Sequence, residues 1–310
     1  MPTAADLPSS SLGRTPTTYA DPEFILYDLW SPELQVCYNT EILYVRAVLN
    51  YKRIPYETVL LEHHEVEAYF SQRRIRFYPG KPTDSAYLSR MTCFSSLPVV
   101  QHVPSRRHIV GRSKIVQYLC TQYPSAPRLE GSSPSSTVTQ PWNSALSLIL
   151  RHFIFPREIL FLSPQAALAL RRYRDNQNET LLESKLWDDD YLWESIRQHL
   201  GDYNKALGKR ALAGQPYLST SGIHPSGADL DTAADLHQIF VFDRNAVAQI
   251  QRYPYIWNLY LSMEAFVRER REGEPGAKRV RASLKSDMNA MSLPRSTTPE
   301  GSPPSMMLKE

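Results

Sequence analysis

The fold is decided by residues 46–62, RAVLNYKRIPYETVLLE, together with the apolar positions just before them. Apolar side chains recur there at the spacing of one helical face, at Ile42, Val45, Val48 and Leu49. Pro55 ends this helix, because proline excludes the residue before it from the helical region. The next residues, 56–61, alternate and are rich in β-forming side chains, which predicts a strand.

A strand is also predicted upstream, at residues 24–29, FILYDL. Strand, helix and strand within about forty residues are typical of a βαβ unit, whose two strands lie parallel. Downstream, residues 98–101 and 107–110 predict an antiparallel hairpin, and residues 112–122 predict a helix with one apolar face. This end of the chain therefore belongs to the α/β class.

Composition restricts the class of protein. The 310 residues are long enough for two domains. No apolar run approaches the roughly 20 residues that cross a bilayer, and residues 1–22 lack the apolar core of a signal peptide, so we expect a cytoplasmic protein with no membrane partner. A net charge of +3 is too weak to predict nucleic acid as a partner. Reduced thiols are expected, because the three cysteines have no metal-binding spacing and cannot all pair: Cys37, Cys93 and Cys120.

The chain divides by composition into a disordered segment, an α/β domain, a linker, an all-helical domain and a disordered tail: 1–22, 23–124, 125–140, 141–272 and 273–310. Pro156 is expected to kink or break the first helix of the all-helical domain. Thr232 and Asp235 predict a capping box at the start of a later helix. The basic residues 278–281, KRVR, are open to two interpretations, a targeting signal or part of a solvated tail.

Residues 46–56, RAVLNYKRIPY, resemble the pattern R-x-A-L-N-Y-K-G-I-P-Y in the first helix of fungal glutathione transferases. The resemblance covers residues 23–270, and further points of similarity are Tyr123-Pro124, Thr232 to Asp235 and Tyr253-Pro254. It implies a thioredoxin-like βαβ-αββα domain followed by a helical bundle. It also implies a transferase that uses glutathione as co-substrate and forms a homodimer.

The resemblance places a glutathione site on two short segments. The bond before Pro98 is expected to be cis and to present the backbone of Leu97 to the cysteinyl part of glutathione. The γ-glutamyl end is expected at the start of the 112–122 helix, where the family has an acidic residue followed by serine. Here Gly111 and Arg112 hold those places, and Ser113 offers a hydroxyl one position later. The helix start and Arg112 suit a carboxylate, but the residue for the ammonium group is missing.

A transferase must also stabilise the glutathione thiolate. The position that matches the family's serine or cysteine is Asn39, whose amide can donate a hydrogen bond. Thr40 and Tyr38 flank it and offer hydroxyls, while Cys37 and Ser31 lie further away. Asn39 is also a good helix cap, so a purely structural role stays open for it.

Two other groups of residues have the composition of possible sites. His63 and His64 lie near acidic residues, but adjacent histidines point apart and no second cluster has ligand spacing, so no metal site is predicted. The apolar residues Phe153, Phe155 and Tyr173 are expected to line a site for an apolar electrophile between the domains.

Three functions stay open on the sequence. The first is a glutathione transferase-like enzyme that adds the thiolate to a small apolar electrophile, in fungal specialised metabolism (secondary metabolism) or detoxification as the resemblance implies. The second is a non-catalytic binding or assembly module with a degenerate glutathione site. The third is a glutathione-dependent isomerase or dehydratase, which needs the thiolate but does not consume glutathione.

Overall fold

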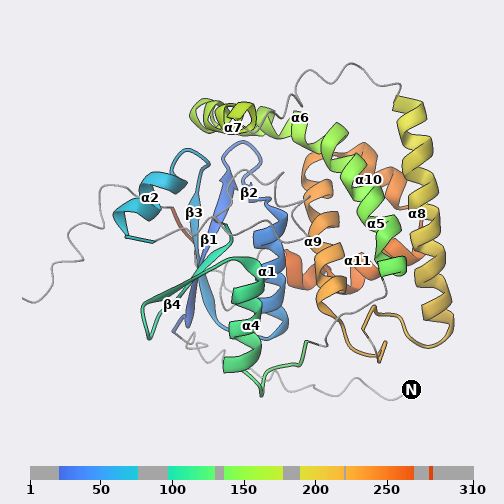
Figure 1. Cartoon of the computed structure of the whole chain (residues 1–310), viewed down its shortest axis with the longest axis horizontal. Coiled ribbons are helices and arrows are strands. Elements are labelled where there is room, and N and C mark those ends of the chain that lie inside the picture. The colour runs from blue at the N-terminus through green and yellow to red at the C-terminus, as the bar shows by residue number, and fades with distance from the viewer. Residues whose placement is uncertain are drawn as a thin grey trace, which may run out of the picture.

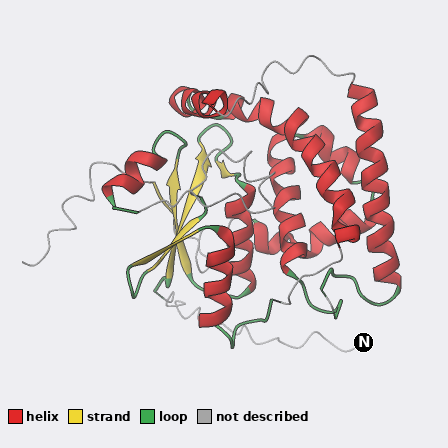
Figure 2. Cartoon of the chain, viewed as in Figure 1, coloured by secondary structure: helices red, strands yellow, loops and turns green. Residues whose placement is uncertain are grey.

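A thioredoxin-like α/β domain is followed by a domain made of helices (Figure 1). The computed structural model describes residues 21–75, 97–129, 136–176, 189–219, 221–268 and 279–281. In Figure 2 the strands lie together at one side of the molecule and the long helices lie at the other. This architecture confirms the predicted class, α/β followed by all-α.

One mixed sheet forms the centre of the first domain. Its strands lie in the order β5-β4-β1-β3-β6, and β2 pairs with the end of β1. The strand bounds are β1 (Phe24–Ser31), β2 (Val36–Cys37), β3 (Tyr56–Leu61), β4 (Val99–His102), β5 (Arg107–Val110) and β6 (Arg279–Arg281). Strands β1 and β3 are parallel and β4 and β5 form an antiparallel hairpin, which confirms both predictions.

Helices cover both faces of the sheet. Helices α1 (Thr40–Tyr51) and α4 (Arg112–Gln122) lie on the face toward the second domain, and α2 (Val66–Gln72) lies on the other face (Figure 1). Helix α1 is buried along most of its length, because it also packs against helices of the second domain. One apolar core is therefore continuous through both domains.

The second domain is a bundle of helices. Its elements are α5 (Ser136–Ile149), the π-helix η1 (Leu150–Ile154), α6 (Phe155–Glu158), the 3₁₀ helix η2 (Ile159–Phe161), α7 (Pro164–Asn176), α8 (Asp189–Leu212), α9 (Gly227–Phe242), α10 (Arg244–Ile250) and α11 (Pro254–Val267). Pro156 lies at the start of α6, directly after the π-helix, so the predicted break is confirmed. No helix among these described residues combines the length and apolarity needed to cross a membrane.

The predicted capping box at Thr232 is wrong, because the helix begins earlier, at Gly227. The cap of α9 is Ser226, whose hydroxyl accepts from the backbone N–H of Asp229 while the Asp229 carboxylate accepts from the backbone N–H of Ser226. Thr232 and Asp235 lie inside the helix, and both are buried. Both pairs have the same spacing, but Ser226 has the extended backbone of an N-cap, with φ −102° and ψ 171°, whereas Thr232 lies within the helix.

Two predicted segment boundaries also differ from the structure. Helix α5 begins at Ser136, inside the predicted linker 125–140. Residues 279–281 of the predicted disordered tail form β6, which pairs with β3. In both cases tertiary contacts order a segment whose composition alone suggested irregular chain.

The residues that produced the family resemblance have structural roles in α1. Arg46 forms a fully buried ion pair and hydrogen bond with Asp28 of β1. Because the two side chains are only 2% and 0% exposed, each charge depends on protein partners rather than on water. This pair fixes α1 against the sheet.

The end of α1 fixes the second domain. The Asn50 side-chain amide donates to the Phe266 carbonyl oxygen at 2.7 Å, in the last turn of α11 where carbonyls lack helical partners. The Asn50 side-chain oxygen accepts from the Tyr56 hydroxyl at 3.1 Å. The Tyr51 hydroxyl donates to the Arg128 carbonyl oxygen at 3.2 Å. The motif therefore connects β3, α11 and the segment between the domains.

Candidate functional site

The turn before β4 lies beside the start of α4. The Leu97–Pro98 peptide bond is cis, as predicted. The backbone N–H of Gly111 donates to the Pro98 carbonyl oxygen at 2.9 Å. Gly111 has a φ of +91°, a conformation that glycine adopts readily, and it has no side chain to cap α4. The first-turn N–H groups and the helix dipole at this end favour a carboxylate.

Arg112, the first residue of α4, reaches toward both domains. Its guanidinium lies 3.7 Å from the centre of the Tyr44 ring, and one nitrogen is 3.5 Å from the Glu41 carboxylate; both residues belong to α1. The other nitrogen is 2.8 Å from the carboxylate of Asp231 on α9. The Arg112 and Asp231 side chains are 26% and 38% exposed, so this pair borders the solvent. Sequence reasoning missed Glu41 and Asp231, since no local pattern connects them with Arg112.

The carboxyl groups around Arg112 have perturbed pKa values. Burial raises the pKa of Glu41, and the Asp231 charge adds to this while Arg112 opposes it. Burial also raises the pKa of Asp235 well above its usual value, with Asp231 acting in the same direction. Burial alone would lower the pKa of Arg112, but Asp231 and Glu41 outweigh it and hold that pKa well above the usual value. Arg112 therefore stays charged and is the one cation of this group.

Asn39, the first of the predicted thiol-activating residues, caps α1. Its backbone is extended, and its side-chain oxygen accepts from the backbone N–H of Ile42 at 3.2 Å. The capping role that the sequence left open is therefore confirmed. The cap uses the oxygen, which is the acceptor of the amide, so the side-chain NH₂ group, which is its donor, remains for a thiolate. Thr40 begins the helix and is half-buried.

Tyr38 points toward the second domain. Its hydroxyl is 2.5 Å from Nε2 of His63, and the same nitrogen is 3.6 Å from the carboxylate of Glu158 on α6. The Tyr38 ring also packs edge-on against Phe242 of α9 at 5.3 Å. Tyr38, His63 and Glu158 are all buried. The phenol thus takes part in a buried array between the domains.

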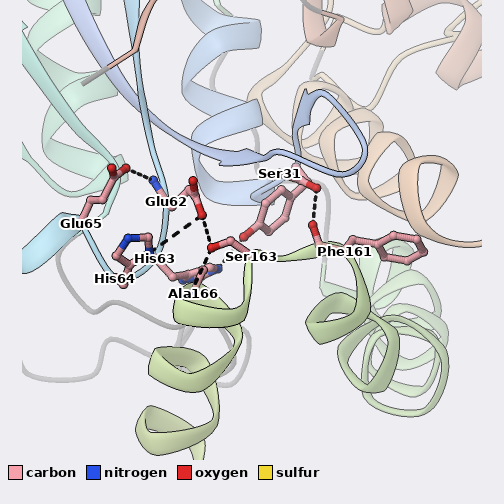
Figure 3. Close-up of polar contacts among 9 residues, drawn as sticks. Ser31, Glu62, His63, His64, Glu65, Phe161, Ser163 and Ala166 are labelled. Carbon is pink, nitrogen blue, oxygen red and sulfur yellow. Dashed lines mark hydrogen bonds and ion pairs between the residues drawn. The ribbon is translucent and has the colours of Figure 1, made fainter. Parts of the chain in front are cut away.

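Ser31 and Cys37 are also engaged or buried. The Ser31 hydroxyl donates to the Phe161 carbonyl oxygen at 2.5 Å (Figure 3). It also accepts from the backbone N–H of Leu34. Cys37 is buried in β2. These positions suggest structural roles for both residues.

Further polar contacts tie the start of α7 to the end of β3 (Figure 3). The Ser163 hydroxyl donates to the Glu62 carboxylate and accepts from the backbone N–H of Ala166 at 3.3 Å. The Glu65 carboxylate accepts from the backbone N–H of Glu62 at 2.8 Å. His64 lies 3.9 Å from the Glu62 carboxylate. In the part of the chain that the structure describes, no group of three His, Cys, Asp or Glu residues is arranged to hold a metal ion.

The residues expected to line an electrophile site lie in the helical core. Phe153 and Phe155 are buried, and the Phe153 ring stacks on Trp193 at 4.9 Å. The side chain of Tyr173 lies outside the described residues. The two phenylalanines are therefore part of the apolar core.

Solved structures match the fold over most of this chain, although no protein-family model and no curated protein gives a significant match. The glutathione transferase GSTFuA3 from Phanerochaete chrysosporium is 21% identical with a TM-score of 0.63, and covers 79% of this chain and 97% of its own. A glutathione S-transferase of Ceriporiopsis subvermispora in complex with glutathione is 18% identical with a TM-score of 0.58, and covers 78% and 97%. GSTFuA2 from Phanerochaete chrysosporium is 19% identical with a TM-score of 0.58, and covers 80% and 99%.

These matches extend over nearly the whole length of the compared structures and include both domains. The order of elements is the predicted one, with the cis turn before β4 and α4 directly after the hairpin. The chain therefore has the glutathione transferase fold, a thioredoxin-like domain followed by a helical domain.

Proposed function

We propose that the protein binds glutathione at the turn before β4 and the start of α4, and uses its thiolate on an apolar electrophile. The observation that carries this proposal is the hydrogen bond from Gly111 to Pro98, which holds the two predicted glutathione-binding segments together. The fold supports it, since one of the matched structures, that from Ceriporiopsis subvermispora, contains glutathione.

The charges at this site complement the γ-glutamyl end of glutathione, which has a carboxylate and an ammonium group. The start of α4 and Arg112 suit the carboxylate, through backbone N–H groups and a charge-assisted bond. Asp231, 2.8 Å from Arg112 and partly exposed, suits the ammonium group. Asp231 would thus take the role of the acidic residue that the family has at the position of Gly111. Ser113 remains a further hydroxyl donor.

Asn39 is the proposed donor to the thiolate, through its side-chain NH₂ group. Thr40, partly exposed at the first position of α1, is the next candidate. Tyr38 ranks below both in the proposal, because its hydroxyl lies against His63. Substitution of each by alanine, with the pKa of bound glutathione as the readout, separates these roles.

The test is calorimetric titration with glutathione between pH 6 and 8.5. We expect binding with proton release in the wild type, and at least about tenfold weaker binding in Arg112→Ala, as the loss of a charge-assisted bond predicts. Lys114→Ala is the matched control, because it removes a charge of the same sign from an exposed position in the same helix turn. No heat up to millimolar glutathione would contradict the proposal.

A non-catalytic module is the second candidate, and the Arg112 ion pairs favour it. A guanidinium held by Glu41 and Asp231 can serve simply to join the domains. In that case Arg112→Ala lowers stability and leaves any glutathione binding unchanged. If glutathione binds and a substrate turns over without loss of thiol, the isomerase or dehydratase function gains support instead. The homodimer, the cytoplasmic location and the role in specialised metabolism or detoxification stay predictions from the resemblance.

A further inference from the structure

The β3 side of the sheet is prone to pair with another chain. Strand β3, YETVLL, has one charged residue and no glycine or proline. All its residues except Glu57 are buried when β6 is in place. A long apolar strand with open N–H and C=O groups along one edge is a template for pairing with a second chain. Without a neighbour, β3 would present such an edge.

The chain itself provides that neighbour. Strand β6 lies parallel to β3, with Arg279 opposite Thr58, Val280 opposite Val59 and Arg281 opposite Leu60. It follows α11 in the chain and comes from the tail that composition predicts to be disordered. Among the residues that the structure describes, the outermost strand on this side of the sheet is therefore β6 and not β3.

The composition of β6 makes it a poor template for further pairing. It is three residues long, and its sequence is arginine, valine and arginine with Lys278 directly before it. Short edge strands and basic side chains are two of the ways in which proteins prevent edge-to-edge association. Along residues 58–60 of β3, the outer edge of the sheet is thus formed by three residues, of which two are basic.

We propose that residues 279–281 guard the β3 edge, and that their removal lets β3 pair with β3 of a second copy of this chain. The basic cluster then has a role within the molecule. This differs from both interpretations that the sequence left open, a targeting signal and a solvated tail. The proposal is independent of whether glutathione binds.

Two deletions test this directly. A chain that ends at Glu272 lacks β6, and a chain that ends at Lys285 keeps it and serves as the matched control. A point variant, Val280→Pro, removes the N–H at the centre of β6, with Val280→Thr as its control. Val280 is 44% exposed, so neither substitution disturbs the core. Hydrogen exchange of β3 and sedimentation velocity over a concentration series are measured for all four.

We expect exchange at Tyr56–Leu61 to be about tenfold faster in the chain ending at Glu272 and in Val280→Pro, with β1 residues 24–27 unchanged as the internal reference. Both should also form larger species as concentration rises, whereas the two controls should behave as the wild type. Equal exchange in all variants would overturn the proposal, and so would faster exchange without self-association. If the deletion also loosens β1, the Val280→Pro result decides.

Discussion

Loss of one partner from the buried pair of Asp28 and Arg46 should destabilise the protein strongly. Asp28→Asn keeps the shape of the side chain but removes the negative charge that faces the guanidinium. The chain offers an exposed pair for comparison: Glu194 and Arg197 in α8 are 3.0 Å apart, with side chains 76% and 37% exposed. Glu194→Gln makes the same chemical change, from carboxylate to amide, at a site exposed to water.

The difference in burial sets the magnitude. Removing one partner of a buried ion pair costs about 3–5 kcal/mol, because the remaining charge is left without compensation and away from water. An exposed pair contributes about 0.2–1 kcal/mol, since water solvates either charge alone. For a chain of this size, Asp28→Asn should lower the melting temperature by about 6–20 °C, and Glu194→Gln by less than about 4 °C.

Thermal unfolding monitored by circular dichroism measures the two melting temperatures, and urea unfolding monitored by tryptophan fluorescence measures the two free energies of unfolding. The double variant Asp28→Asn with Arg46→Met removes both charges, and we expect it to recover a large part of the loss, because no unpaired charge remains. If Asp28→Asn costs no more than Glu194→Gln, burial does not control the strength of this pair, and the reasoning is refuted.

Asn50→Ala should lower the free energy of unfolding by about 2 kcal/mol in urea titrations, because the hydrogen bonds to Phe266 and from Tyr56 are lost. Tyr51→Phe removes an exposed hydrogen bond and should cost less than about 1 kcal/mol. Equal costs for the two variants would contradict the anchoring role of Asn50. Asp235→Asn should make the protein more stable than wild type at pH 7, with the bond from Trp142 kept. Burial raises the pKa of Asp235 above its usual 3.8, so the folded wild type binds this proton more tightly than the unfolded chain and loses stability as pH rises above that value. Thermal unfolding should therefore show a gain at pH 7 that disappears near pH 3, and a gain that is independent of pH would count against this assignment.

Local patterns predicted most elements of the first domain. The helix before Pro55, the strand after it and the hairpin at residues 98–110 follow from periodicity, proline and β-forming residues, all of which act within a few positions. The same reasoning failed for α9, where Ser226 and Thr232 begin patterns of equal spacing. The preference between them depends on which residues become buried, and that is not a local property.

The sequence by itself determined the α/β class and the order of elements in the first domain, because these depend on backbone preferences of neighbouring residues. The cis turn was expected from the resemblance to glutathione transferases, and the start of α4 favours a carboxylate because a helix start has free N–H groups. Only the tertiary structure decided which charges meet. Arg112 contacts Glu41 and Asp231, Tyr38 contacts His63, and β6 contacts β3. These partners lie far apart in the chain, and they come together because packing of the apolar core of two domains fixes their distances.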